Sequence, residues 1–259
     1  MILDLRTRTV IRLRAAGCVF AEDEAELLLE AAEGAALDAL VARRVAGEPL
    51  EHLLGWVEFA GQRVPVDPGV FTPRRRTELL VELAVAHGGA VVVDLCCGAG
   101  AVGAAVHRQL GGGELVAADV EPAAVACARH AVEPLGGRVV AGDLYAALPA
   151  DLRGRVDLLC VNAPYVPSAA VADMPPEARD HEPLVALDGG DDGLDLHRRV
   201  AAGAADWLAE DGLLLLETSR GQADRTAALV REGGLTAEVV TDPDEDRGGT
   251  VVVGRSARR

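Results

Sequence analysis

Short hydrophobic runs and amphipathic stretches alternate along the sequence from about residue 90 to its end. Runs rich in valine and leucine predict strands at residues 90–95, 114–119, 138–142, 156–161, 212–218, 235–241 and 249–254. Apolar positions three and four residues apart predict helices between them, at residues 100–109, 122–132, 194–209 and 221–233. This alternation is typical of an α/β protein with a doubly wound, mostly parallel seven-stranded sheet. The last two strands are joined only by the acidic loop 242–246, which predicts an antiparallel hairpin at one edge.

The first 57 residues follow a different pattern, with short amphipathic helices. These helices are predicted at residues 5–16, 23–32, 37–45 and 48–55. The next residues alternate in polarity around Gly61, Pro65 and Pro68, which indicates a hairpin, and a further helix is predicted at 77–86. We therefore expect three parts, which are a small helical domain at 1–57, a hairpin linker at 58–70 and the α/β domain at 71–259.

Composition narrows the classes of partner. The net charge of -16 opposes a broad footprint on phosphate backbones, so we expect no direct binding to nucleic acid. No apolar run approaches the roughly 20 residues of a membrane-spanning helix, and no signal peptide is found, so we expect a cytoplasmic protein that binds no membrane. The five cysteines form no C-x-x-C pair, and neither a disulfide framework nor a zinc site is indicated.

A glycine-rich turn follows the first predicted strand of the sheet. The strand ends at Asp94, and Gly98, Gly100 and Gly103 have the G-x-G-x-x-G spacing, which allows a tight turn and a close approach of the backbone to a ligand. The next strand ends at Asp119, where a carboxylate can accept hydrogen bonds from ribose hydroxyls. Both NAD and S-adenosylmethionine carry such a ribose, so these residues alone leave the cofactor open.

Other polar segments are interpreted as ordinary structure. Arg75 and Arg76 are interpreted as surface charges, with steering of an anionic group as the alternative. Cys96 and Cys97 are interpreted as small, packed loop residues, and reactive thiols are the alternative. The acidic stretch 188–195 is interpreted as a solvated loop and helix start. Since the six histidines lack metal spacing, no metal site is expected.

The segment 162–165, Asn-Ala-Pro-Tyr, follows the buried strand 156–161. It resembles the Asn-Pro-Pro-Tyr motif of S-adenosylmethionine-dependent amino methyltransferases, with Ala163 in place of the first proline. EPLEHLLG, TPRRRTE, VVVDLCCGAG, GDL, HEPLVALDGGDDGLDLHRR and LLLETSRGQ are similar, in order, to segments of the HemK/PrmC family of protein-glutamine methyltransferases. The similarity covers about residues 43–255, and the N-terminal helices resemble that family's substrate-binding domain only loosely. Cys96 and Cys97 stand where the family usually has glycine and threonine.

The resemblance implies a Rossmann-like fold and S-adenosylmethionine as the cofactor. It implies that the turn 96–100 contacts the methionine part of the cofactor, Asp119 its ribose, and Leu144 beside Asp143 its adenine. The cofactor-binding residues expected in this way are Asp94, Cys96, Cys97, Gly98, Ala99, Gly100, Asp119, Val120, Asp143, Leu144 and Asn162. The catalytic residues expected in this way are Asn162, Ala163, Pro164 and Tyr165.

The chemistry of amide methylation gives the same four residues a physical role. An amide nitrogen is a poor nucleophile because its lone pair is delocalised into the carbonyl, so it must be held and polarised. The side-chain oxygen of Asn162 and the backbone carbonyl of Ala163 can each accept one amide N–H, which aims the lone pair at the methyl group. Tyr165 supplies a flat wall against the planar amide. The alternative for 162–165 is an ordinary turn after a strand.

The leading hypothesis is methyl transfer to the side-chain amide of a protein glutamine, which in the resembled family lies in the Gly-Gly-Gln loop of a translation release factor. A release factor is therefore the expected partner. Methylation of a small amine or amide, or of adenine in nucleic acid, would use the same acceptors, although the net charge of -16 opposes nucleic acid. An NAD-dependent oxidoreductase and a non-enzymatic binding protein are the alternatives from other classes.

Overall fold

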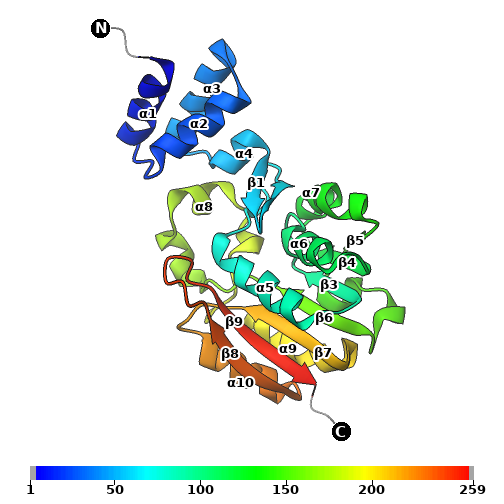
Figure 1. The fold of residues 1–259 in the computed structure, drawn as a ribbon. Coiled ribbons are helices and arrows are strands. Elements are labelled where there is room, and N and C mark those ends of the chain that lie inside the picture. Colours follow the sequence, from blue (N-terminus) through cyan, green and yellow to red (C-terminus); the bar gives the residue numbers. More distant parts are fainter. Residues whose placement is uncertain (1–3, 257–259) are drawn as a thin grey trace.

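The computed structural model describes residues 4–256, in which a small helical bundle stands beside an α/β body (Figure 1). In the described part of the N-terminal region the bundle consists of α1 (Leu5–Ala15), α2 (Ala21–Ala31), α3 (Gly34–Val45) and α4 (Leu50–Leu54). These helices bury Leu13, Leu28 and Val41 between them. Gly55 ends α4 in the left-handed conformation that glycine adopts without strain. The bundle therefore has a hydrophobic core of its own, apart from that of the body.

A sheet of seven strands forms the centre of the body within the described residues, in the order β5-β4-β3-β6-β7-β9-β8. Its strands are β3 (Val91–Leu95), β4 (Glu114–Asp119), β5 (Arg138–Ala141), β6 (Val156–Val161), β7 (Leu208–Glu217), β8 (Leu235–Thr241) and β9 (Thr250–Ser256). Neighbours from β5 to β7 run parallel, whereas β9 runs antiparallel to β7 and β8. The mostly parallel sheet and the antiparallel edge hairpin are thus confirmed. The strand order reverses between β3 and β6, whose carboxyl ends meet where Leu95 pairs with Val161, and folds of this type bind ligands at that edge.

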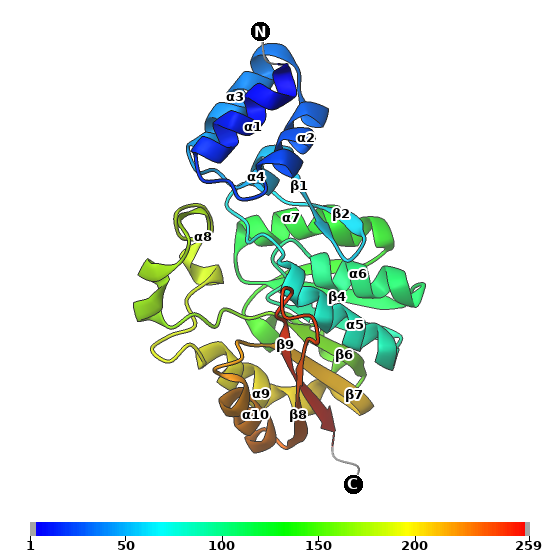
Figure 2. The ribbon, with the colours of Figure 1, turned by 60° about the vertical axis from the view of Figure 1, so that its left-hand side comes forward.

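Alternate side chains of the buried strands face opposite layers of helices. Val92 and Leu158 share one hydrophobic core with the helices of the first layer, whereas Val93 and Leu159 share another with those of the second. The first layer comprises α5 (Glu78–His87), α6 (Ala101–Leu110) and α7 (Pro122–Val132), and the second comprises α9 (Asp195–Trp207) and α10 (Ala223–Glu232). Figure 2 shows the sheet between these two layers. Within residues 4–256, none of the helices has the length and apolar character needed to cross a bilayer.

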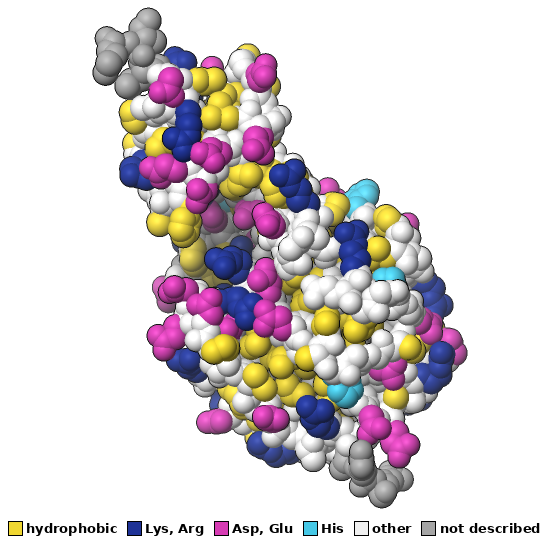
Figure 3. Space-filling model, viewed as in Figure 1, with side chains coloured by type: hydrophobic (Ala, Val, Ile, Leu, Met, Phe, Trp, Pro, Cys, Tyr) yellow, Lys and Arg dark blue, Asp and Glu magenta, His cyan; other side chains and the backbone are white. Residues whose placement is uncertain are grey.

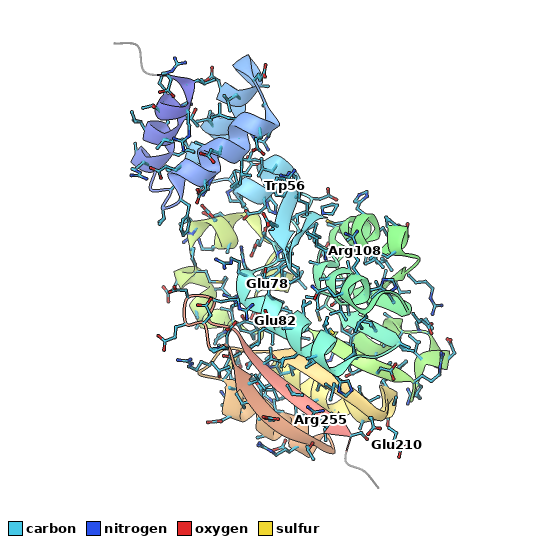
Figure 4. The ribbon with its side chains drawn as sticks, in the orientation of Figure 1. Trp56, Glu78, Glu82, Arg108, Glu210 and Arg255 are labelled. Atoms are coloured by element: carbon cyan, nitrogen blue, oxygen red, sulfur yellow. The ribbon has the colours of Figure 1, made fainter. Side chains whose placement is uncertain are left out.

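A two-stranded hairpin, β1 (Trp56–Phe59) and β2 (Gln62–Pro65), connects the bundle to the body. The carboxylate of Glu78, on α5, accepts a hydrogen bond of 3.0 Å from the backbone N–H of Ala60 at the hairpin tip. The next acidic residue of α5, Glu82, pairs at 2.9 Å with Arg247 in the loop between β8 and β9 (Figure 4). Helix α5 therefore fixes both the hairpin and the edge loop to the body.

Two stretches differ from the sequence prediction. Helix α9 ends at Trp207 and β7 begins at once, whereas the sequence predicts a helix to 209 and a strand from 212. The strand extends this far because Gly212 has no side chain, since a Cβ there would lie 2.5 Å from the carbonyl oxygen of Val156. Between 162 and 193, where the sequence predicts no element, the structure has α8 (Pro176–His181) and 3-10 turns at Ser168–Asp173 and Leu184–Ala186.

Candidate active site

A cavity of about 600 Å³ opens at the carboxyl ends of β3, β4 and β6, a volume typical of sites for small molecules. The glycine turn, the two turns that end β4 and β6, and the segment 174–187 all contribute to its wall. The predicted site residues that line it are Cys96, Gly98, Asp119, Val120, Asp143, Leu144, Asn162, Ala163, Pro164 and Tyr165. Among the described residues, four predicted ones do not line it: Asp94, Cys97, Ala99 and Gly100.

Two aspartates hold the glycine turn. The buried carboxylate of Asp94 accepts a hydrogen bond of 2.8 Å from the backbone N–H of Gly103, so it fixes the start of α6 from below the turn. The carboxylate of Asp119 accepts bonds of 2.9 Å from the backbone N–H groups of Gly98 and Glu121. Burial raises the pKa of Asp119 despite these hydrogen bonds. Because each carboxylate oxygen accepts more than one hydrogen bond, Asp119 keeps acceptor capacity toward the cavity.

The two adjacent cysteines are packed in this turn, as the sequence predicts. Burial raises the pKa of the Cys96 and Cys97 thiols above its ordinary value, so neither thiol is a nucleophile near neutral pH. Cys96 has a φ of 55°, in the left-handed region that glycine adopts more readily. The left-handed backbone conformation of Cys96 therefore explains why the resembled family usually has glycine at this position.

Asp143 and Leu144 form the opposite end of the cavity. Leu144 also has a left-handed φ, of 48°, which turns its side chain back over the sheet. The carboxylate of Asp143 pairs with Arg199 of α9 at 2.7 Å, and both residues are half-exposed. Arg199 is not among the predicted site residues, because a charged residue near a helix start is usually solvated.

The turn after β6 presents its polar groups to the same cavity. The side-chain amide of Asn162 donates a hydrogen bond of 3.3 Å from Nδ2 to the hydroxyl of Thr77, which precedes α5. The Tyr165 hydroxyl donates a bond of 3.2 Å to the buried carboxylate of Glu217, at the end of β7. Burial and the Glu217 charge raise the pKa of Tyr165 above its ordinary value, so the ring stays neutral. Asn162 and Tyr165 are thus fixed by elements distant in the sequence.

The acidic stretch 188–195 differs from its interpretation as a solvated loop, because its glycine backbone packs against this turn. A Cβ on Gly189 would lie 2.8 Å from both the Pro164 carbonyl oxygen and the Tyr165 Cα. The backbone N–H of Gly189 also donates a bond of 2.8 Å to the carbonyl of Val166. From the far side, Gln222 Nε2 donates to the carbonyl of Tyr165 at 3.0 Å. The side chains of Asp191 and Asp195 are exposed, those of Asp188 and Asp192 are half-buried, and α9 begins one residue after its predicted start at 194.

One arginine also departs from the surface role that the sequence suggests. Arg75 and Arg76 are both exposed, but Arg76 also lines the cavity, lies 5.9 Å from the centre of the Tyr165 ring and pairs at 3.3 Å with Glu217. Burial raises the pKa of Glu217, whereas its contacts with Thr77, Arg76 and Tyr165 lower it. Glu217, Thr77 and Gln222 were not predicted, because only the fold brings them to the turn.

Helix α8 lies below the bundle in the view of Figure 1, and its Glu177 and Ala178 line the cavity. Glu177 also accepts a bond of 2.6 Å from Arg44 of α3. The buried guanidinium of Arg44 also pairs at 2.6 Å with Glu24 of α2. This ion cluster connects the bundle to the segment over the cavity.

On the face shown in Figure 3, acidic and basic side chains are interspersed. Within the described part of the chain, no group of three or more histidine, cysteine or acidic side chains is arranged to hold a metal ion.

Known proteins are similar to this chain in sequence and in fold. The model of the small methyltransferase domain family matches residues 62–175. The release factor glutamine methyltransferase of Geobacter sulfurreducens is 37% identical over 227 residues, which are 86% of this chain and 78% of that protein. The 4-amino-L-phenylalanine/4-methylamino-L-phenylalanine methyltransferase of Streptomyces pristinaespiralis is 34% identical over 78% of this chain and 72% of that protein.

Solved structures support the fold. A methyltransferase from Pyrococcus furiosus superposes with a TM-score of 0.58 at 14% identity, over 83% of this chain and 97% of that one. The Rossmann-like methyltransferase architecture predicted from the sequence is therefore confirmed. The relatives, the domain match and the cavity at the strand ends together show that the chain belongs to the family of release factor glutamine methyltransferases.

Proposed function

We propose that this protein transfers the methyl group of S-adenosylmethionine to the side-chain amide nitrogen of a glutamine in a translation release factor. The observation that carries the proposal is the shared cavity, which places Asn162, Ala163 and Tyr165 within one enclosure with Asp119. The Asp119 carboxylate can therefore bind a nucleoside while the carbonyl oxygens of Asn162 and Ala163 accept hydrogen bonds from an amide in the same cavity.

The cavity fits the cofactor. Gly98 exposes its backbone to the cavity, the Asp119 carboxylate can accept ribose hydroxyls, and Leu144 offers an apolar surface for adenine. The wall is mostly apolar and carries both carboxylates, such as those of Asp119 and Glu121, and the guanidinium groups of Arg74, Arg76 and Arg199. When bound, S-adenosylmethionine supplies a methyl group on a positively charged sulfur.

The residues of the turn after β6 would hold the acceptor. The Asn162 side-chain oxygen and the Ala163 carbonyl each accept one N–H of the glutamine amide, which leaves the nitrogen lone pair directed at the methyl group. The Tyr165 ring packs against the amide plane, and Glu217 keeps the Tyr165 hydroxyl in place. As the nitrogen–carbon bond forms, the bond between the methyl carbon and sulfur would break and leave the sulfur as a neutral thioether, and one N–H proton would pass to solvent.

The helical bundle would bind the protein substrate. It is joined to α8 by the Arg44–Glu177 pair, so a protein that contacts the bundle lies beside the segment that covers the cavity. Release factors act in translation, so the proposed place of action is the cytoplasm. The expected three-part division at 1–57, 58–70 and 71–259 is retained as part of this proposal.

A small aromatic amine is the second candidate acceptor. The Streptomyces pristinaespiralis relative is named for 4-amino-L-phenylalanine, and this chain has Ala163 at the position of the motif's first proline. An alanine keeps the backbone acceptor and removes the ring that narrows the site. The two candidate acceptors differ in size, and an assay with each of them as the substrate distinguishes between them.

Mass spectrometry tests the choice. Purified protein is incubated with S-adenosylmethionine and either a release factor or 4-amino-L-phenylalanine. We expect one added methyl group on the glutamine of the Gly-Gly-Gln motif and none on a release factor with that glutamine replaced by glutamate. Methylation of the amino acid alone would overturn the proposed substrate and retain the chemistry.

A further inference from the structure

We propose that Thr77 is a positioning residue that fixes whether the oxygen or the nitrogen end of the Asn162 side-chain amide meets the methyl acceptor. Thr77 precedes α5, far from Asn162 in the sequence, and its hydroxyl accepts the 3.3 Å bond from Asn162 Nδ2. The inference rests on the proposed function, because it assigns a role in presenting the acceptor nitrogen.

The hydroxyl of Thr77 does not cap α5. Thr77 ends the 3-10 turn Arg75–Thr77 with a helical backbone (φ −72°, ψ −14°), whereas a capping threonine has an extended one. Here the side chain makes no capping hydrogen bond. It is 1% exposed and faces Asn162 and Glu217 instead, so its orientation serves those two side chains.

The direction of the hydrogen bonds follows from Glu217. Its Oε1 accepts from the Tyr165 hydroxyl at 3.2 Å and from Arg76 Nε at 3.3 Å. Oε2 is buried and no hydrogen-bond partner satisfies it among the described residues, and the nearby Thr77 hydroxyl lowers the pKa of Glu217 by interacting with this carboxylate. An ionised carboxylate only accepts hydrogen bonds, so the Thr77 proton points to Glu217.

These hydrogen bonds then allow only one orientation of the Asn162 side-chain amide. With its proton directed at Glu217, Thr77 offers only lone pairs to Asn162 and so requires the Nδ2 group. The opposite end of the amide, Oδ1, is thereby turned toward the cavity, where it can accept an N–H of the substrate. A rotated amide would present its own N–H groups to the substrate N–H groups, and the two sets of donors would repel each other.

The sequence offers an unusually direct probe of this arrangement. Asn162 is the only asparagine in the sequence, so protein labelled with nitrogen-15 at asparagine side chains gives one pair of amide proton signals. Those protons report the Nδ2 hydrogen bond without requiring turnover. We would measure their chemical shifts and exchange rates with solvent in each variant, together with cofactor affinity and methylation kinetics.

Four variants separate positioning from packing. Thr77→Val keeps the shape and removes the hydroxyl, whereas Thr77→Ser keeps the hydroxyl. Thr72→Val is the matched control, since the Thr72 hydroxyl is buried and without a partner among the described residues. Glu217→Gln keeps its amide oxygen for Arg76 and Tyr165 and directs N–H groups at Thr77, which forces the Thr77 proton toward Asn162.

We expect Thr77→Val to shift the Asn162 proton signals, speed their exchange and lower kcat by about a hundredfold, with KM and cofactor affinity within about twofold. Thr77→Ser and Thr72→Val should behave as the wild type. Glu217→Gln should lower kcat as Thr77→Val does, and the double variant should be no worse than either single one. Unchanged Asn162 signals and rate in Thr77→Val would overturn the inference.

The proposed function can fail separately. If the wild type methylates no release factor, the substrate assignment fails, while the Asn162 signals still decide whether Thr77 holds the amide. If Thr77→Val does not fold, Glu217→Gln carries the same test, and wild-type signals in that folded variant would overturn the inference as well.

Discussion

Gly189 lies so close to Tyr165 that a Cβ at residue 189 would be 2.8 Å from the Tyr165 Cα. The two residues belong to different loops, and the contact sets the spacing between them. Gly189 is needed here for its size, since its φ lies outside the left-handed region. The turn that holds the acceptor is therefore supported from behind by backbone.

Gly189→Ala should displace this turn. We expect kcat for methyl transfer to fall by about a hundredfold, because a shift of the turn by about 1 Å misplaces both acceptors. Gly221→Ala is the matched control, since a Cβ there meets nothing within 4 Å, and its activity should equal that of the wild type. Comparable rates for the two variants in a labelled-methyl assay would contradict this role of Gly189.

Asp94 should make the protein less stable as pH rises. Burial raises its pKa from 3.8 to about 8, so the folded state binds the proton more tightly than the unfolded state. The stability from this group is complete below the unfolded pKa and is lost as pH rises through the folded pKa. Asp94→Asn keeps an acceptor for the Gly103 N–H and carries no charge.

The melting temperatures of Asp94→Asn and of the wild type, measured as a function of pH, test whether ionisation of Asp94 destabilises the folded protein. We expect that of Asp94→Asn to exceed that of the wild type at about pH 9, and we expect the difference to shrink as pH falls toward the unfolded pKa of 3.8. A difference between the two proteins that does not change with pH would show that Asp94 is ionised throughout.

Arg44 should stabilise the protein far more than its neighbour Arg43. Removing Arg44 leaves the carboxylate of Glu24, whose side chain is 11% exposed, without its partner, and we expect Arg44→Ala to lower the free energy of unfolding by about 3 kcal/mol. Arg43 pairs with Glu48 while 51% exposed, so Arg43→Ala should lower the free energy of unfolding far less. Urea unfolding measures both changes, and equal losses would mean that burial of the Arg44 pair adds nothing.

The sequence predicts the strands, helix and turns around the site because these elements are determined by residues close together in the sequence. The strands at β4 and β6 and the helix α7 have the predicted bounds, since periodic apolar residues and flanking turns determine them. The glycine turn, Asp119 and the 162–165 turn each end a strand, and parallel strands bring such ends to one edge of the sheet. The cavity walls made by these segments were therefore predictable.

The supports of the site depend on contacts between distant residues. Thr77 is 85 residues from Asn162, and Arg76 is 141 residues from Glu217, so no periodicity relates them. The irregular segment 162–193 is held by backbone bonds and by Gln222, which lies 57 residues from Tyr165. A polar residue of this kind is indistinguishable from a surface residue until the fold is known.

Replacing Asn162 by alanine tests whether the side chain of this residue holds the nitrogen that accepts the methyl group. The initial rate of methyl transfer from labelled S-adenosylmethionine to a release factor is measured for both proteins at saturating cofactor, with cofactor affinity determined by calorimetry. We predict a loss of at least about a hundredfold in rate, with cofactor affinity changed far less, because the acceptor nitrogen loses one of its two holding groups. An Asn162→Ala protein that methylates the release factor at the wild-type rate would contradict the account.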